Sequence, residues 1–514
     1  MVCLPHRRRS PGLHRRQSVR AVIGLLLGSL TCCTVRADEP PVPRAASVSL
    51  REAIQLALLH NRSLEKAGLD REVQRFDLRV AETEFTPRLD LLSSSFYNPV
   101  KINGASTTTR TSDTAVAITE RVPTGARVAL LWDNYATGLS TAPKAYDSTL
   151  SLQLDQPLLR GGGLPANLAN LRIARLSEQT NILEFKRNVI VTITNVIFAY
   201  RNLQQSQRQV EVSEVAVTRA QEQLRINRAL VSSGILAPAE IIQTEADIAN
   251  QEFNLLTAQA NRDSARFALV KILDVDRDTP FESMDPIVLP TFTLDLETCR
   301  RLAFANRPDF QQALQSQSAS ELSVVSARNN QLWYLNLSSR YKVTGGDTSY
   351  GAAIDRSFTR ANEDWNVGVT LQVPFGDLTR KQGYLHARNR ASKSAIDVTE
   401  ITDNIEIEVR DALRTIELST KRVRVAAVAR ELAEKKLEIE KGKLQVGRTT
   451  NFAVVLFQND LVTARLNEIG TQIAYLNSIS QLEQTLGTTL AVWGIRIEDL
   501  GNGSGPARAL SATP

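Results

Sequence analysis

Few residues in this chain have the type and spacing that chemistry requires. After the first 37 residues, the only histidines are His60 and His386, and the only cysteine is Cys299. These residues form no clustered metal-binding spacing. The longest glycine run, at 161–163, lacks the Lys-Ser/Thr of a phosphate-binding loop and is better suited to a bend between a strand and a helix. We therefore expect no enzyme, no catalytic residue, no metal site and no cofactor.

The chain begins with a segment that has the order of a secretory signal peptide. An arginine-rich stretch precedes an apolar run at 21–30, and an A-x-A-like cleavage pattern follows at Val35-Arg36-Ala37. The apolar run is too short to span a membrane. Residues 1–37 are therefore expected to be removed. Cys32 and Cys33 lie near a lipoprotein-like cleavage pattern, but the residues before them fit it poorly, so cleavage without lipidation is favoured.

The net charge of the mature chain is close to zero. The leader holds seven of the 61 basic residues and no acidic residue, so 54 basic residues remain against 55 acidic ones. The basic character of the whole sequence belongs to the leader. Nucleic-acid binding, which needs a retained basic face, is therefore not expected. With Cys299 alone, the mature chain has no intrachain disulfide.

The chain contains two copies of one unit. The first part of the unit recurs at a constant numbering offset of 246, and its second part recurs at an offset of 213. At the offset of 246, the matching residues are Leu50, Leu56, Ala57, Ala81, Leu89 and Leu91 with Leu296, Leu302, Ala303, Ala327, Leu335 and Leu337. At the offset of 213, they are Gly234, Asp247, Asn254, Leu269 and Leu273 with Gly447, Asp460, Asn467, Leu482 and Leu486. Such a duplication indicates a symmetric tube rather than an enzyme with a single cleft.

Short segments in each unit alternate apolar and polar residues. The clearest runs from Trp365 to Val373, and similar segments lie at 149–155 and 335–343. This period of two predicts strands with one apolar face. It fits a soluble sandwich and a membrane barrel equally well, because both cover one face with apolar material. Aromatic residues near the strand ends favour the barrel modestly.

Very long helices are the decisive feature of the sequence. No proline follows Pro165 as far as Ala229, which corresponds to about 65 residues, or roughly 100 Å of helix. Aliphatic residues recur there every seven positions beside a seam of Ala and Ser, as knobs-into-holes packing requires. They are Ile182, Val189, Val196, Leu203, Val210, Val217, Leu224 and Val231, and the second unit has Val409, Ile416, Val423, Leu437 and Leu444. Arg430 interrupts the second series, and the sequence alone gives no physical account of it.

Each long helix is expected to end in a glycine-containing turn that leads into a shorter helix. The turns lie at 231–238 and 446–451. Each unit therefore reads as helix, strands, long helix, tight turn and helix. We assign residues 38–293 to the first repeat, 294–500 to the second repeat and 501–514 to a disordered tail.

Several of these segments resemble the TolC-like outer membrane efflux proteins, or outer membrane factors. The matching segments are Ser49 to Leu58 with His60-Asn61, its echo at 302–308, the Gln156-Pro157-Leu158 exit from the strands, both glycine turns, and Gln458-Asn459-Asp460-Leu461 after the second turn. Each segment alone is weak, but together they occur in order and twice. The resemblance covers about residues 48–499.

The resemblance implies an α+β membrane protein of the bacterial outer membrane. Three chains would share one transmembrane β-barrel in outer membrane lipid, continued by a long α-helical, coiled-coil-like periplasmic tunnel, with two structural repeats in each chain. We expect the family's four strands per chain. Six is the alternative, because the drop in offset from 246 to 213 makes the first repeat the longer one, and its segment 116–135, broken at 123–125, is typical of an extra hairpin.

The resemblance also implies two functional regions at the periplasmic end of the tunnel. A periplasmic adaptor (membrane fusion) protein is expected to dock at Gly234, Ile235, Leu236 and Ala237 in the first repeat and at Gly447, Arg448, Thr449 and Thr450 in the second. In the family, rings of acidic residues near the closed tip attract cations. Glu240 matches such a position, with Asp247 as a second charge. The counterpart of Glu240 in the second repeat is Ala453, and the next position expected to be acidic there holds Leu456, which predicts a weaker acidic ring.

The expected function is that of an outer-membrane channel-tunnel for efflux or type I secretion, which exports substrates from the periplasm or cytoplasm to the exterior. A chain without a nucleotide site cannot pump by itself, so an inner-membrane transporter must supply the energy through the adaptor. The alternative is a fibrous coiled-coil surface or scaffold protein without a channel. Such a protein would keep the seven-residue repeats but would not need two-faced strands.

Overall fold

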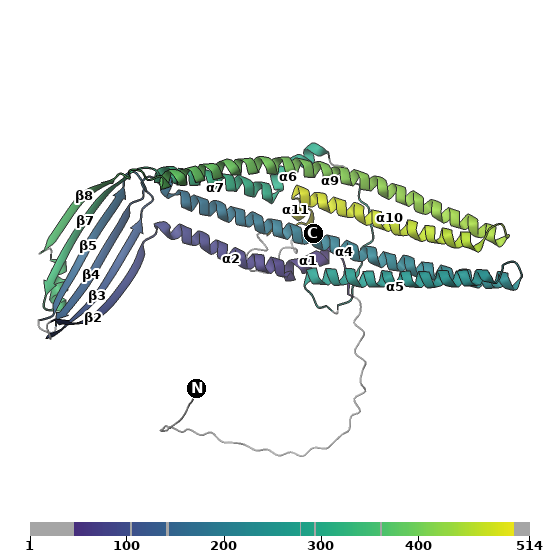
Figure 1. Ribbon diagram of the computed structural model, residues 1–514, viewed down its shortest axis with the longest axis horizontal. Helices are drawn as coiled ribbons and strands as arrows, with labels where there is room; N and C mark the ends of the chain where they lie inside the picture. Colours follow the sequence, from purple (N-terminus) through teal and green to yellow (C-terminus); the bar gives the residue numbers. More distant parts are fainter. Residues whose placement is uncertain are drawn as a thin grey trace, which may run out of the picture. The chain divides into compact units, whose positions relative to one another are not determined.

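The structure is a computed structural model of the 514-residue chain, and it describes residues 46–102, 105–139, 143–277, 279–291, 295–359 and 362–497. The signal peptide, Cys32, Cys33 and the tail at 501–514 lie outside the described residues, so these assignments stay predictions. The described part combines one large β-sheet with long paired helices (Figure 1).

Two sets of helices follow the same order along the chain. The first set is α1 (Leu50–His60), α2 (Arg62–Glu82), α4 (Ala169–Ser232) and α5 (Ala239–Leu273), and the second is α6 (Leu296–Asn306), α7 (Pro308–Asn330), α9 (Thr379–Gln445) and α10 (Asn451–Leu486). Short helices are η1 (Thr83–Phe85), α3 (Leu164–Asn167), α8 (Tyr350–Phe358) and α11 (Thr489–Trp493). The starts of α1 and α6 keep the first sequence offset and the ends of α4 and α9 keep the second, so both offsets are confirmed. The repeat boundaries near 293 and 500 stay predictions.

Equivalent capping residues begin the first helix of each set. Ser49 accepts a hydrogen bond from the backbone N–H of Glu52 at 3.3 Å, and the Glu52 carboxylate accepts one from the backbone N–H of Ser49 at 2.8 Å. This capping box satisfies two N–H groups that a helix start leaves without partners. Asp295 takes the same place before α6 and accepts from the N–H of Thr298. The sequence therefore fixes where these two helices begin.

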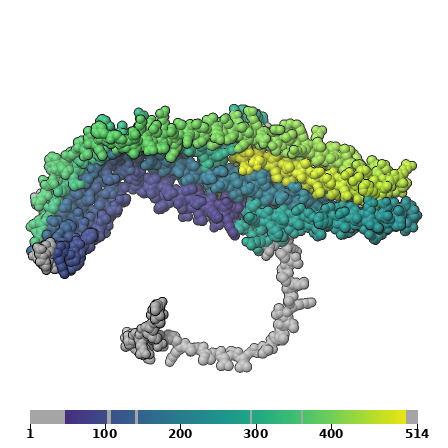
Figure 2. Space-filling view, in the orientation of Figure 1, coloured from purple at the N-terminus to yellow at the C-terminus, as the bar shows by residue number. Residues whose placement is uncertain are grey.

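The seven-residue repeat of α4 provides the core between neighbouring helices. Val189, Val196, Leu203 and Val210 are buried, as are Ser206, Ser213 and Ala220 of the small-residue seam. The small seam allows close packing, and α4 contacts α5, α7, α10 and α2. In the second set, α9 and α10 pack against each other, and the space-filling view shows their green and yellow surfaces running together (Figure 2).

Arg430, which interrupts the aliphatic series of α9, links α9 to α10 through charges. Its guanidinium donates to Glu434 on α9 and to Glu468 on α10, both at 3.1 Å. Arg465 of α10 donates back to Glu434 at 2.9 Å. The four side chains form an alternating network between the two helices, and this accounts for a basic residue at an otherwise apolar position.

Within the described residues, six strands form one antiparallel sheet in the order β2-β3-β4-β5-β7-β8. They are β2 (Arg88–Ile102), β3 (Ala105–Arg121), β4 (Arg127–Leu139), β5 (Ala145–Pro157), β7 (Tyr334–Asp347) and β8 (Glu363–Gln372). The expectation of four strands per chain is therefore wrong. The first repeat supplies four strands and the second supplies two, because the longer first repeat contains the extra hairpin β3–β4, which turns at Val122–Ala126.

Cross-strand register gives the sheet two chemically different faces. The face that we call the apolar face carries Leu89, Leu91, Val116, Ile118, Val128, Leu130, Leu150, Leu152, Leu154, Leu335, Leu337, Val367, Val369 and Leu371. The opposite, polar face carries Asp90, Asp113, Asp133, Ser151, Gln153, Asp155, Asn336, Arg340, Lys342 and Asn366. Most of the apolar face is open to solvent in the single chain, and Trp365, which also lies on this face, is 72% exposed. This alternation confirms the strand pattern expected from the sequence.

Two small elements have no counterpart in the sequence reading. A parallel pair joins β1 (Ala46–Val48) to β6 (Phe281–Ser283), and Tyr200 of α4 donates from its hydroxyl to the Val48 carbonyl at 2.9 Å. Helix α8 packs on the apolar face over β5 and β7, with Ala353 and Ser357 buried against the sheet. Gly345 permits this contact, because a Cβ atom there would lie 2.1 Å from the Ala353 carbonyl oxygen.

The β3–β4 turn generates a prediction about Gly125. Its φ of +96° favours glycine, and an added Cβ would lie 2.1 Å from the carbonyl oxygen of Gly161. Gly125→Ala should therefore lower the yield of folded protein severalfold, since the backbone strain alone costs about 1–3 kcal/mol. The measurement is the fraction of purified protein that resists trypsin. Gly138→Ala in β4 is the control, because its Cβ would meet atoms only at 3.6 Å and beyond. Equal trypsin resistance of the two variants would contradict the prediction.

Candidate functional site

The turn between α4 and α5 is held by a glycine in the left-handed conformation. Gly234 has a φ of +71° and donates its N–H to the Val231 carbonyl at 3.0 Å. The N–H of Ile235 reaches back to the Leu230 carbonyl at 2.9 Å. This pair of bonds is a Schellman motif, which ends a helix by satisfying its last carbonyls. We call residues 233–238 the first tip turn.

The turn between α9 and α10 uses the same motif at the equivalent glycine of the second repeat. Gly447 has a φ of +69° and bonds to the Leu444 carbonyl at 3.0 Å, and the N–H of Arg448 bonds to the Lys443 carbonyl at 2.9 Å. Thr450 then caps α10 by accepting from the N–H of Ala453. We call residues 446–450 the second tip turn. The two repeats therefore end their long helices by the same backbone geometry.

A carboxylate reinforces the second tip turn only. Glu440 of α9 accepts from the Thr449 hydroxyl and from the Lys443 ammonium. These hydrogen bonds hold the pKa of the Glu440 carboxyl below its usual value, the Thr449 bond contributing most. The stabilisation is present above the usual pKa of a glutamate and is lost as the pH falls through the lowered value. The second turn is therefore tied to its own helix by side chains as well as by backbone.

The structure brings the predicted docking residues together in two exposed turns. Gly234 to Ala237 lie in the first tip turn and Gly447 to Thr450 in the second, with Ile235 57% exposed. Exposed apolar side chains continue onto the next helices at Ile242 and Phe452. Backbone turns of this kind need no apolar exposure for their own stability. The docking role itself stays a prediction.

The two predicted gate acids lie on one helix but in different surroundings. Glu240 is half-buried in the first turn of α5, and its Oε2 atom has no hydrogen-bond partner among the described residues. Asp247, two turns further on, is buried and accepts from the Gln251 amide at 3.2 Å. In the second repeat, Ala453 of α10 occupies the position that corresponds to Glu240, and Asp460 occupies the position that corresponds to Asp247. The gate role of both acids stays a prediction.

Known proteins share this arrangement of helices and strands. Residues 53–274 match a family model described as outer membrane efflux protein. The Campylobacter jejuni CmeC outer membrane channel is 17% identical with a TM-score of 0.65, and 86% of each chain is covered. The Vibrio cholerae outer membrane protein VceC is 18% identical with a TM-score of 0.65, covering 85% of this chain and 96% of its own. The open state of the Neisseria gonorrhoeae MtrE outer membrane channel is 15% identical with a TM-score of 0.64, covering 86% and 89%.

Residues 53–274 are similar to the outer membrane efflux protein family, and the chain shares its fold with outer membrane channels. No curated protein matches it in sequence. The family-model match and the shared fold confirm the TolC-like resemblance and agree with the expected location in the bacterial outer membrane, with the helices in the periplasm. Members of this family are efflux channels and not enzymes.

The cysteine, the two histidines and the glycine run that could have taken part in chemistry lie within helices or at a strand–helix junction. Cys299 is buried in α6, and burial raises the pKa of its thiol. His60 ends α1 and His386 lies on α9. The glycine run joins β5 to α3, as expected, and Gly161 donates to the Asn329 side chain at 2.8 Å.

No three His, Cys, Asp or Glu side chains are grouped for a metal in the part of the chain that the structure describes. Nor is any helix described there both long and apolar enough to cross a membrane.

A buried polar cluster near the tips was missed by the sequence reading. The Thr244 hydroxyl of α5 accepts from the amides of Asn227 on α4 at 2.7 Å and Asn451 on α10 at 3.0 Å. The Gln223 amide donates to the side-chain oxygens of both asparagines, at 2.9 and 3.5 Å. Thr244 donates its own proton to the Glu240 carbonyl. We call Gln223, Asn227, Thr244 and Asn451 the tip network, and it joins the two helical pairs of the efflux protein.

One sequence signal could have revealed the tip network. Asn227 continues the small-residue seam of Ser206, Ser213 and Ala220 by one more step of seven. An asparagine at such a core position fixes register and partner at a cost in stability, so it marks a specific contact. Its partner Asn451 comes from the other repeat, and nothing in the local sequence indicates which helix will face it. The network depends on tertiary structure.

The tip network generates a prediction about Thr244. Thr244→Val keeps the shape but leaves two buried amides without their acceptor, which costs about 1–3 kcal/mol each. The first turns of α10 should then open more often, so their amide hydrogen exchange should accelerate roughly tenfold or more. Thr257→Val is the matched control, since Thr257 also lies on α5 but is exposed and bonds only to the Phe253 carbonyl. Equal exchange in the two variants would show that the network adds no stability.

Proposed function

We propose that three copies of this chain form one outer-membrane channel that exports substrates together with a periplasmic adaptor and an inner-membrane transporter. The observation that carries the proposal is the six-stranded sheet with one apolar face and two open edges. In the described residues, β2 and β8 each pair with one strand only. Hydrocarbon offers no hydrogen bonds to a free edge, so a lipid-embedded sheet must close.

Closure across three chains gives the sheet a complete set of partners. Three six-stranded sheets would make a barrel of about 18 strands, an even number within the range of outer-membrane barrels. The apolar face would contact lipid and the polar face would line the water-filled pore. The charged residues of the polar face, among them Asp133 and Lys342, favour this orientation, because charges facing lipid are costly. A fibrous scaffold protein would have no use for such a sheet.

The helices carry apolar stripes that have no partner within the described part of one chain. On α9 the exposed residues Leu418, Val425, Leu432 and Ile439 recur every seven positions, and Val446 continues the series. On α5, Phe253, Leu256 and Phe267 are also exposed. A seven-residue repeat that stays exposed indicates a missing helix. Neighbouring chains in a tunnel wall would supply it.

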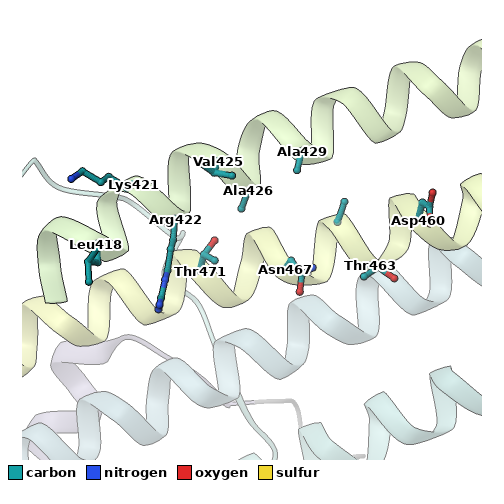
Figure 3. A pocket seen from close by; sticks show the side chains of 11 residues that line it. Leu418, Lys421, Arg422, Val425, Ala426, Ala429, Asp460, Thr463, Asn467 and Thr471 are labelled. Atoms are coloured by element: carbon teal, nitrogen blue, oxygen red, sulfur yellow. The ribbon is translucent and has the colours of Figure 1, made fainter.

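A groove between α9 and α10 lies beside the α9 stripe (Figure 3). It has a volume of about 590 Å³, and its floor is formed by small side chains such as Ala426, Ala429 and Ala464. Small residues at a helix surface leave holes that side chains of another helix fill. The groove supports the proposal that α9 and α10 pack against a neighbouring subunit.

The adaptor would dock on the two tip turns, and the transporter would supply the energy. Both turns are exposed and share one backbone geometry, so an adaptor with repeated binding elements could engage both of them. Their exposed apolar side chains provide the contact area that a transient interface needs. Glu240 would form a weak cation-attracting ring near the closed end, because the second repeat contributes no acid at the corresponding position.

Tip docking predicts the effect of a charge at both glycines. A Cβ at Gly234 or Gly447 meets no atom within 4 Å, and Asp tolerates the left-handed backbone better than most residues. Gly234→Asp with Gly447→Asp should therefore leave trimer assembly intact but abolish export. Export is measured as cell resistance to a panel of antibiotics and metal salts, and assembly as trimer on a semi-native gel. Gly68→Asp on α2 is the control, since its Cβ also meets nothing. Unimpaired export by the double variant would refute docking at the turns.

The gate assignment predicts how the channel responds to Mg²⁺. Glu240→Gln should weaken Mg²⁺ block of the reconstituted channel roughly fivefold, since the interaction of one carboxylate with a nearby cation in water contributes about 1 kcal/mol. Block is measured as the Mg²⁺ concentration that halves the single-channel current from the periplasmic side. Glu252→Gln, which removes an exposed acid from the same helix, should have little effect. If both variants keep the wild-type block, Glu240 does not line the gate.

A further inference from the structure

Residues at the ends of β3, β4, β5 and β7 and at the start of α9 line a polar cavity. These element ends lie where the sheet joins the helices (Figure 1). The volume of the cavity is about 800 Å³, and four arginines line it: Arg121, Arg127, Arg160 and Arg380. Asp155 is the one acidic residue in its lining. The cavity therefore concentrates positive charge at one level of the molecule.

The fold brings these arginines together from both repeats. Arg121 ends β3 and pairs in register with Arg127, which begins β4 and in turn lies opposite Asp155 of β5. Arg160 follows β5, and Arg380 lies in the first turn of α9. The strand register places Arg121 and Arg127 on the polar face. We call these four residues the arginine cluster.

Carboxylates neutralise the arginine cluster only in part. Arg121 pairs with Glu84 and also donates to Asn167, and Arg380 lies 3.6 Å from Asp377. The Asp377 carboxylate also interacts electrostatically with the Arg160 guanidinium. Yet the Nη1 atom of Arg380 is buried without a hydrogen-bond partner among the described residues. Unsatisfied buried guanidinium nitrogens are costly, so this atom indicates a missing acceptor.

The other two arginines have no ion pair in the described part of the chain. Arg127 is exposed to the cavity, and no carboxylate lies within 4.0 Å of it there. Arg160 stacks over the Tyr334 ring at 5.2 Å, which orients its guanidinium without neutralising it. Asp155 is itself engaged as acceptor of the Gln153 amide at 2.7 Å. Donors on several sides of the cavity are therefore left for a ligand.

We propose that the arginine cluster binds anionic groups of the phosphate or carboxylate class as exported molecules pass from the helices into the barrel. Guanidinium groups bind such anions through paired, charge-assisted hydrogen bonds. Three chains would repeat the cluster around the pore, and rings of arginine select anions in other pores. This proposal rests on the proposed channel, because only there does the polar face line a pore. It assigns a preference for acidic substrates at the base of the barrel.

Inorganic pyrophosphate tests the arginine cluster in the full-length trimer. In planar bilayers it should block the wild-type current, and Arg127→Gln with Arg160→Gln should weaken this block about tenfold or more, since each lost charged hydrogen bond is worth over a factor of ten. Arg110→Gln is the matched control, because Arg110 projects on the opposite face of β3 and stacks on Tyr97. It should keep the wild-type block.

Two outcomes would overturn the assignment. Equal block in the wild type and the double variant would show that pyrophosphate binds elsewhere, and absence of wild-type block would show that no such site exists. Current without pyrophosphate reports the channel separately, so a conducting protein without block leaves the proposed function standing. Calorimetric titration of the detergent-solubilised trimer with pyrophosphate tests the site without conduction. There, wild-type and control trimers should bind, and equally tight binding by the double variant would again exclude the cluster.

Discussion

The unpaired edges of the six-stranded sheet constrain the whole molecule. Strands β2 and β8 each present a row of backbone groups without partners in the described chain, and their apolar faces suit lipid. Lipid cannot satisfy those groups, so in the proposed channel strands from other copies would pair with them. The same symmetry would then hold for the helices, because they continue directly from the strand ends. A single chain of such an assembly should expose the apolar residues that pack against its neighbours. The apolar residues that recur every seven positions on α9 and the aromatic residues on α5 are exposed in this way.

The two repeats are most alike at the turns and helix starts, where the local structure depends on backbone geometry. Both long helices end in a Schellman motif at a glycine with φ near +70°, and both sets begin with a capped helix. Equivalence fails where side chains decide. Of the two tip turns, only the second is held by a carboxylate, Glu440, and of the two helices that follow these turns, only α5 carries an acid in its first turn, at Glu240. The repeats therefore share a scaffold, while the properties of the tip come from their differences.

Much of the fold could be predicted because its signals are local. Helix length, the buried series Val189, Val196 and Leu203, and both glycine turns follow from periodicity and backbone preference. The number of strands was predicted wrongly, because the family's four strands were preferred over the hairpin signal at 123–125. The contacts of Arg430, the tip network and the arginine cluster could not be predicted, since each joins residues from helices or strands far apart in sequence. Helix α8 was missed because its nine residues form a stable helix only against the sheet.

Opposite charges at the two ends of the helical region would act on a passing molecule independently. The tip holds Glu240 at one end of α4 and α5, and the arginine cluster lies near the other end of α4. Helix α4 has 64 residues, so about 100 Å separates its ends, whereas charges in physiological salt are screened within roughly 8 Å. The electrostatic field of Glu240 therefore does not alter binding at the arginine cluster, and the field of the arginine cluster does not alter binding at Glu240. A weak acidic ring would pass anions at the entrance with little repulsion, and the arginine cluster would then hold them where the pore widens into the barrel. The lack of an acid at the second-repeat position equivalent to Glu240 and the presence of arginines at the barrel base thus favour the same class of substrate.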